Sequence, residues 1–191
     1  MGMYNYIKNT VQSRTAAWKA AQRERLIMWR KENAITRIER PTNIVRARTL
    51  GYKPKEGILL ARVRVSRGGK QRPQIKKGRR PTHSHQQLVM KKSYQRIAEE
   101  RAAKRFSNCE ILNSYKAGQD GKHYWFEIIV IDPCQGQIQA DKNLRWICSE
   151  RNRVLHGKTS AGRKGRGLRS GKGQGHEKHR PSLRAHKRLG K

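Results

Sequence analysis

Two groups of residues have types and spacing that could bind a phosphate or a metal, but neither completes a known site. The glycine-rich run 159–167, TSAGRKGRG, could cradle a phosphate, but it lacks a Gly-Lys-Ser/Thr ending and a preceding strand. Five histidines could be metal ligands, but no cysteine pair accompanies them, and their basic surroundings would repel a cation. These histidines are His83, His85, His156, His176 and His179. We therefore expect no nucleotide-binding enzyme and no metal site.

Acidic and thiol side chains also lack the grouping that catalysis requires. Asp120, Asp132 and Asp141 are dispersed over expected turns and strand ends, whereas a nuclease needs clustered carboxylates to hold its metal ions. The three cysteines, Cys109, Cys134 and Cys148, are odd in number and form no CxxC pair, which argues against a disulfide framework. The sequence predicts a non-enzyme without cofactor or small-molecule substrate, in a reducing intracellular compartment.

The charge balance predicts a polyanionic partner. The 191 residues include 46 Lys and Arg but only 13 Asp and Glu, which gives a net charge of +33. A membrane partner would need an apolar run of about 18 residues or a lipid anchor, and neither is present. An acidic protein could offset a local patch, but the positive charge extends along most of the chain. Nucleic acid is the best interpretation.

The composition favours folded RNA as that nucleic acid. Glycines at 67–70, 162–167 and 171–175 allow the backbone to approach phosphates closely. Arg outnumbers Lys, which favours forked contacts to phosphate. Aromatic residues make up only 6% of the chain, so we expect recognition of RNA shape and backbone more than base stacking. Affinity should fall steeply with salt.

Basic and glycine residues in two stretches are the candidate RNA contacts. The first set is Arg40, Arg46, Arg48, Lys53, Lys55, Arg62, Arg64, Arg67, Gly68, Gly69, Lys70, Arg72, Lys76, Lys77, Arg79 and Arg80. The second set is Lys158, Ser160, Arg163, Lys164, Arg166, Arg169, Lys172, Arg180 and Arg184.

Three segments must position these side chains. Residues 1–36 form an N-terminal helical segment, with a helix over 4–32 and a break near Ser13. Residues 37–150 form an α+β core that carries a basic loop at 67–82. Residues 151–191 form a basic extension with almost no apolar side chains, which we expect to be disordered in the free protein.

Apolar patterning predicts the elements of the core. Alternation indicates a strand at 58–65, with Arg62 and Arg64 on the face opposite Val63. A helix is expected over 86–105, where Glu99 and Glu100 pair with nearby cations. Strands over 109–115 and 122–132 follow, joined by a turn whose Asp120-Gly121 pair suits positive dihedrals. Trp146 and Ile147 could anchor a last short strand.

Motifs along the whole chain are similar to those of one protein family. They are Met1-Gly2 with Tyr4 and Tyr6, Arg40-Pro-Thr42, Leu50-Gly-Tyr-Lys53, Arg62-Val-Arg-Val65, Arg67-Gly-Gly-Lys70, Ile97-Ala-Glu-Glu-Arg-Ala102, Leu112-Asn-Ser-Tyr115, Phe126-Glu-Ile-Ile-Val-Ile-Asp-Pro133 and Thr159-Ser-Ala-Gly-Arg-Lys164. The chain resembles the L-fifteen-e family of large-subunit ribosomal proteins, which archaea and eukaryotes share. Lys116, Gln119 and Lys158 depart from the family's pattern.

The resemblance implies a fold and a set of partners. It implies an α+β fold in which a small antiparallel sheet with packing helices carries long basic extensions embedded in ribosomal RNA. The expected partners are large-subunit rRNA and neighbouring ribosomal proteins, with no membrane and no homo-oligomer. The expected location is the cytoplasm, in the large ribosomal subunit, with a nucleolar stage during assembly in a eukaryote.

Two other functions remain open from the sequence. A DNA-compacting, histone-like protein is the first, although such proteins usually dimerise through an apolar helix face. An RNA-processing enzyme is the second. Co-sedimentation with chromosomal DNA instead of ribosomal subunits would favour the first, and turnover of an RNA substrate would favour the second.

Overall fold

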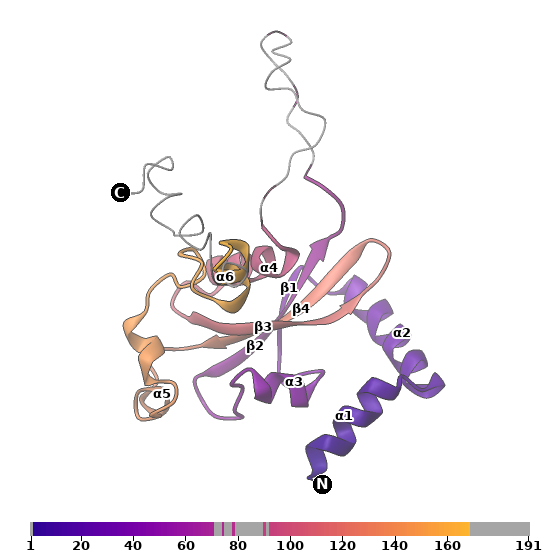
Figure 1. The fold of residues 1–191 in the computed structure, drawn as a ribbon, viewed down its shortest axis with the longest axis horizontal. Coiled ribbons are helices and arrows are strands. Elements are labelled where there is room, and N and C mark those ends of the chain that lie inside the picture. Colours follow the sequence, from indigo (N-terminus) through magenta and orange to yellow (C-terminus); the bar gives the residue numbers. More distant parts are fainter. Residues whose placement is uncertain (1, 71–73, 75–77, 79–89, 91, 169–191) are drawn as a thin grey trace, which may run out of the picture.

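A four-stranded antiparallel sheet forms the centre of the molecule (Figure 1). The computed structural model describes residues 2–70, 74, 78, 90 and 92–168. The strands are β1 (Ile35–Ile38), β2 (Ile58–Ser66), β3 (Glu110–Gln119) and β4 (His123–Ile131), in the order β1-β2-β4-β3. The expected α+β class with a small antiparallel sheet is confirmed. The central position of β4 explains its nearly continuous apolar sequence, because both of its faces are covered.

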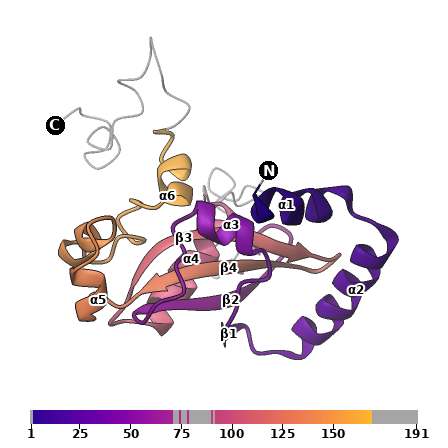
Figure 2. The ribbon, with the colours of Figure 1, turned by 90° about the horizontal axis from the view of Figure 1, so that it is seen from below.

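Helices cover both faces of this sheet (Figures 1 and 2). Helix α4 (Tyr94–Arg105) and the short α6 (Ser160–Gly165) lie on one face. Helices α3 (Ile44–Thr49) and α5 (Gly136–Gln139) and the 3-10 helix η2 (Arg145–Ser149) lie on the other. The protein is therefore a three-layer arrangement with the sheet in the middle.

Strand alternation divides the apolar residues into two cores. On the α4 face, Val63, Ile128 and Val130 are fully buried and pack with Ala98 and Ala102. The opposite face holds a second cluster, formed by Ala47, Tyr52, Leu60, Leu112, Tyr115, Ile129, Ile131, Ile138, Leu144 and Ile147. Successive strand residues point to opposite faces, so one strand supplies both cores.

The N-terminal segment forms two helices with the break predicted near residue 13. Helix α1 (Met3–Ser13) ends at Arg14, whose φ of 46° is left-handed, and α2 (Ala16–Lys31) follows. Thr15, and not Ser13, caps α2 by accepting a hydrogen bond from the Trp18 backbone amide. Trp29 anchors α2 on the sheet, where its ring centroid lies 6.0 Å from that of Trp125.

Helix α4 begins later than the pattern predicted. Its N-cap is Ser93, whose side chain accepts from the Arg96 amide, so Met90 precedes the helix and is exposed. Residues 86–89 and 91 lie outside the described residues. The side of α4 that packs on the sheet carries Ala98 and Ala102, because small side chains let the helix approach closely, and Arg101 is exposed.

The hairpin turn predicted between β3 and β4 is present, but its backbone conformation differs from the expected one. The turn between β3 and β4 closes with the Asp120 amide donating to the His123 carbonyl at 2.9 Å. Gly121 has no positive φ there. Instead, the Asp120 carboxylate accepts a hydrogen bond from the Lys122 amide at 2.7 Å. This side-chain hydrogen bond stabilises the turn without the positive φ that was expected at Gly121.

Three further elements, η2, β1 and α3, differ from the expectation. Trp146 and Ile147 lie in the 3-10 helix η2 and not in a strand, with Ile147 buried against the core and Trp146 44% exposed. Strand β1 crosses the expected segment boundary at residue 36, and helix α3 was not predicted. Both are short, and a short element gives too few residues for a periodic signal.

Glu99 and Glu100, which were expected to pair with cations, have different environments. Glu100 binds Arg96 Nε at 3.0 Å and Lys92 Nζ at 2.8 Å, as expected. Glu99 is fully buried and accepts instead from the Ser114 and Thr159 hydroxyls, the latter at 2.6 Å. Burial raises the pKa of Glu99, although both hydroxyls and nearby arginines oppose the shift.

This burial predicts a pH-dependent term in stability. Because its pKa is raised by folding, Glu99 binds a proton more tightly in the folded state than in the unfolded state. The free energy of unfolding should therefore fall as the pH rises from the ordinary glutamate pKa through the raised pKa of Glu99. We expect Glu99→Gln to remove the term, with urea unfolding followed at a series of pH values. The exposed Glu39→Gln is the control. Superimposable pH profiles for the Glu99 variant and the native chain would contradict the prediction.

Candidate nucleic-acid interface

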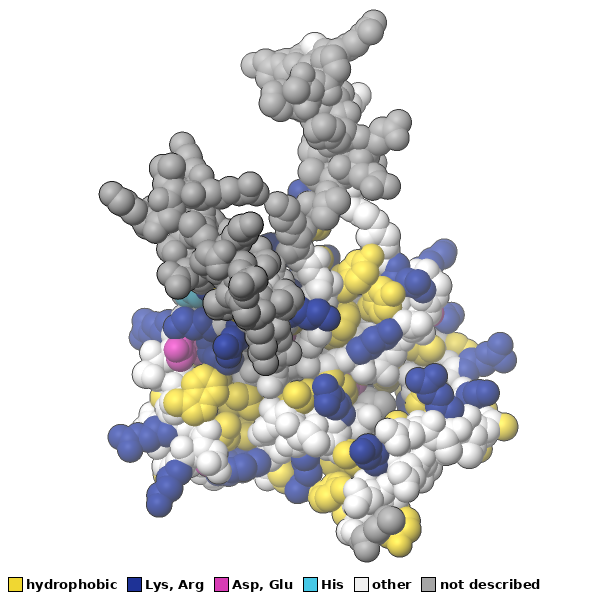
Figure 3. Space-filling model, in the orientation of Figure 1, with side chains coloured by type: hydrophobic (Ala, Val, Ile, Leu, Met, Phe, Trp, Pro, Cys, Tyr) yellow, Lys and Arg dark blue, Asp and Glu magenta, His cyan; other side chains and the backbone are white. Residues whose placement is uncertain are grey.

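Nearly all described carboxylates bind groups of the protein itself. Every acidic residue except Glu177 lies in the described part of the chain. Within that part, only Glu24 and Glu39 accept no hydrogen bond from another described residue. The others are Glu32, Glu56, Glu99, Glu100, Glu110, Asp120, Glu127, Asp132, Asp141 and Glu150. The face shown in Figure 3 carries many Lys and Arg side chains and few Asp or Glu side chains.

Two of the candidate RNA contacts hold helix α2 against the sheet. The Arg62 guanidinium lies 4.2 Å from the Trp29 ring centroid, and its side chain is only 10% exposed. It pairs with Glu32 at 3.2 Å and with the buried Glu127 at 3.7 Å. Arg64 donates to the Arg30 carbonyl at 2.6 Å. These contacts give both arginines structural partners within the protein.

Lys53 and Lys55 also have an internal partner. Both ammonium groups lie 2.8 Å from the same carboxylate oxygen of Asp141. These two hydrogen bonds hold the pKa of Asp141 well below its ordinary value. The three side chains join the chain before β2 to the turn after α5. Lys158 is likewise paired, with Glu150 at 2.5 Å.

A second set of candidates is exposed and unpaired. Arg40, Arg46, Arg163 and Lys164 have exposed side chains that form no ion pair with any described residue. Arg48 is exposed as well, and its guanidinium lies 5.1 Å from the Tyr4 ring centroid. Charges of this kind are available to neutralise phosphates.

Helices α1 and α3 enclose a basic groove of about 320 Å³. Its lining comprises Lys8, Val11, Gln12, Asn43, Val45, Arg46 and Thr49. No carboxylate is among these residues. Lys8 was missed by the sequence reasoning, because nothing in the chain near it indicates that α1 packs beside α3.

The start of the basic loop is anchored by aromatic residues. Arg67 lies 5.0 Å from the Tyr124 ring centroid and donates to the Asp120 carbonyl at 2.7 Å. The Tyr94 hydroxyl accepts from the Gly68 amide and donates to its carbonyl. Gly68 has a φ of 101°, which suits glycine. Gly69 and Lys70 follow and are exposed, so the loop leaves the core at a fixed point.

The first part of the predicted extension is packed on the core. The Glu110 carboxylate accepts from the backbone amides of Asn152 and Arg153, and Thr159 binds Glu99. Val154 is buried. The expectation of a disordered extension is therefore wrong for residues 151–168. Although this segment is polar on average, a few buried side chains and two core carboxylates, Glu99 and Glu110, hold it against the core.

Close glycine packing positions helix α6. A Cβ on Gly162 would lie 2.6 Å from the Gly157 Cα, and Gly157 itself has a φ of 64°. Thr159 caps the helix by accepting from the Gly162 amide. The guanidinium of Arg166 donates to the His156 and Gly157 carbonyls, and Ser160 is half-buried. Arg163 and Lys164 thereby project from a fixed turn.

Several candidate contacts lie outside the described residues. They are Arg72, Lys76, Lys77, Arg79, Arg80, Arg169, Lys172, Arg180 and Arg184. Of the histidines weighed as metal ligands, His83, His85, His176 and His179 also lie outside.

Neither a three-residue metal-binding cluster nor a membrane-spanning helix is present in the described part of the chain. Residues 2–70 and 92–168 contain no group of three or more His, Cys, Asp or Glu side chains placed to hold a metal ion. None of the helices described there is long and apolar enough to cross a bilayer.

Comparison with known proteins supports the resemblance seen in the motifs. A family model described as Ribosomal L15 matches residues 2–186. The chain is also 47% identical, over 199 aligned residues, to the large ribosomal subunit protein eL15 of Methanocella arvoryzae. That alignment covers 98% of this chain and 97% of the relative. Both matches span nearly the full length, so the chain belongs to the L15e family of large-subunit ribosomal proteins.

Proposed function

We propose that this protein binds folded large-subunit rRNA through phosphate contacts and thereby supports assembly of the subunit and translation. The observation that carries the proposal is the internal use of the carboxylates. The net charge of +33 already counts all 13 acidic residues, and most of the described ones are bound to amides, hydroxyls and selected cations of the protein itself. The remaining cations need an external anion, and the phosphates of RNA supply one.

The free cations are held by three rigid supports. Arg46 and Arg48 extend from α3, Lys70 follows the anchored Gly68, and Arg163 and Lys164 extend from the packed α6. Fixed supports reduce the conformational entropy lost when the side chains bind phosphates. Rigid, widely separated contacts suit an RNA that is itself folded.

The proposed partners are rRNA and neighbouring ribosomal proteins, in the large subunit in the cytoplasm. If the source is a eukaryote, assembly would include a nucleolar stage. We propose a structural role without catalysis, cofactor or self-association. The sequence match to a large ribosomal subunit protein supports this role.

Direct binding tests the proposal. Full-length protein should bind transcribed large-subunit rRNA more tightly than small-subunit rRNA of equal length in a filter assay, and it should co-sediment with large subunits from cell extract. Co-sedimentation with chromosomal DNA, together with absence from large subunits, would overturn the proposal in favour of a DNA-compacting protein.

Free and paired lysines should differ in their effect on salt dependence. Lys164→Gln removes an exposed, unpaired charge, and we expect it to reduce the slope of log affinity against log salt by about 1. Lys158→Gln removes a charge that is paired one-to-one with Glu150, so its slope should stay close to the native one. Filter binding over a salt series measures both slopes. Equal reductions in the two variants would show that internal pairing does not determine which cations contact RNA.

A further inference from the structure

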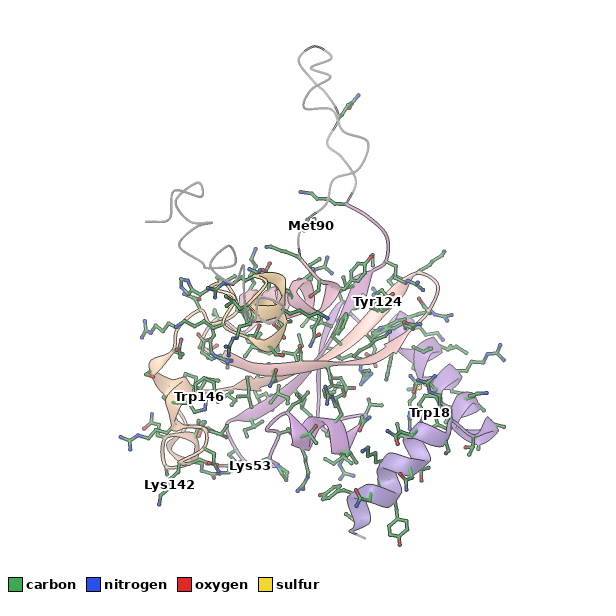
Figure 4. All side chains as sticks on the ribbon, in the orientation of Figure 1. Trp18, Lys53, Met90, Tyr124, Lys142 and Trp146 are labelled. Carbon is green, nitrogen blue, oxygen red and sulfur yellow. The ribbon has the colours of Figure 1, made fainter. Side chains whose placement is uncertain are left out.

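Trp146 is a large aromatic side chain on the surface, and it is fixed in orientation. It lies on η2, and 44% of the residue is exposed (Figure 4). Its indole Nε1 donates to the Asn143 carbonyl at 2.9 Å, which fixes the polar edge of the ring. The ring therefore cannot turn inward without losing this hydrogen bond. The next residue, Ile147, is fully buried and holds η2 on the core.

Arg153 fixes the ring from one side. Its guanidinium carbon lies 4.6 Å from the Trp146 ring centroid. The same guanidinium donates to the Ile111 carbonyl at 2.7 Å and to the Leu112 carbonyl at 3.1 Å. Arg153 is thus bound to β3, and the 44% of Trp146 that stays exposed beside it is available to solvent or a ligand.

The surroundings of this ring carry unpaired positive charge. Lys142 and Arg145 are close neighbours of Trp146 in sequence, and Arg151 follows η2. All three are exposed and form no hydrogen bond or ion pair through their side chains with the described residues. The acidic residue of this segment, Glu150, is bound to Lys158. An approaching anion therefore meets no free carboxylate in this segment.

We propose that Trp146 is a stacking platform for one unpaired base of the large-subunit rRNA, with Lys142, Arg145 and Arg151 available to the adjacent phosphates. The inference rests on the proposed rRNA-binding function and adds a base contact to it. Aromatic rings of fixed orientation bind splayed-out bases by stacking, and nearby cations neutralise the flanking backbone. Charge complementarity favours this occupant over a protein surface, since only a strongly acidic protein would match the same cations.

Crosslinking of the native chain tests the contact without any substitution. Large subunits whose rRNA contains 4-thiouridine are irradiated, and the peptides of this protein are analysed by mass spectrometry. We expect a nucleotide adduct on Trp146. Trp29 and Trp125, which are buried in the core, are the internal controls and should carry none. An adduct joining Trp146 to another ribosomal protein, or no adduct on Trp146, would overturn the proposal.

Matched variants separate base stacking from apolar contact. Trp146→Phe keeps an aromatic ring, Trp146→Leu keeps an apolar side chain without one, and Leu155→Ala shortens an exposed apolar residue of the following segment. In variant subunits probed by 2′-hydroxyl acylation, we expect one or two nucleotides to become about tenfold more reactive with Leu, and to change less than about twofold with Phe or with Leu155→Ala. Unchanged reactivity in the Leu variant would overturn the proposal.

The stacking platform and the proposed rRNA-binding function can be disproved separately. If the protein is present in large subunits but Trp146 neither crosslinks to RNA nor alters its reactivity, only the stacking platform is wrong. If the protein is absent from large subunits, the proposed function is wrong as well. If the Leu variant does not enter subunits, crosslinking of the native chain decides.

Discussion

Raising monovalent salt from about 50 mM to about 200 mM should lower the affinity of this protein for large-subunit rRNA by about 10³ to 10⁵. An effect of this size corresponds to roughly six to ten neutralised phosphates, each of which releases condensed counterions on binding. The exposed cations Arg40, Arg46, Arg48, Lys70, Arg163 and Lys164 supply enough charge for the lower end of this range. Filter binding or fluorescence anisotropy at a series of salt concentrations measures the slope.

Competition with a second polyanion controls this measurement. Heparin should displace the RNA at low salt, and the salt slope should be insensitive to whether the anion is chloride or acetate if release of cations from the RNA dominates. An affinity that changes by less than about tenfold over the same salt interval would contradict recognition through phosphates.

Replacement of Glu127 by alanine should cause the largest loss of stability, about 3–5 kcal/mol. Glu127 is completely buried in the central strand β4. Its carboxylate accepts from the Thr42 amide at 2.9 Å, from the Thr42 hydroxyl at 2.5 Å and from the Tyr115 hydroxyl. Removal of the carboxylate leaves these three donors without an acceptor. It also removes a negative charge that lies 3.7 Å from the nearly buried Arg62 guanidinium.

Urea unfolding followed by circular dichroism measures this loss. The matched control is Glu39→Ala, since Glu39 is exposed and accepts no hydrogen bond from the described residues, and its effect should stay within about 0.5 kcal/mol. Glu127→Gln should be intermediate, because the amide retains one acceptor. A loss of less than about 1 kcal/mol for Glu127→Ala would show that water replaces the carboxylate and that the buried network is not required.

The Glu127 network also bears on RNA binding. Thr42 belongs to the Arg40-Pro-Thr42 motif, and its two hydrogen bonds to Glu127 fasten this segment to β4. Arg40 itself is exposed at the start of that motif. We infer that Glu127 positions a surface arginine from inside the protein, although it cannot contact a ligand.

Fold elements with a strong local signal could be predicted from the sequence. The alternation around Val63 predicted β2, and the apolar run 124–131 predicted a central strand, because one or both faces of these strands are buried along most of their length. Elements set by tertiary contacts could not be predicted in this way. Strand β1, helix α3 and the 3-10 helix η2 have only four, six and five residues, which is too short for a periodic pattern.

The sequence by itself determined that this protein is basic, lacks a recognisable catalytic site and resembles one ribosomal family. Charge, composition and motif order are properties of the chain and need no folded structure. Only the tertiary structure decided which cations are free, because the partner of a cation is far away in sequence: Lys53 and Asp141 are 88 residues apart. It also placed Trp146 at the surface with Arg153 against its ring, since burial and stacking depend on which segments the fold brings together.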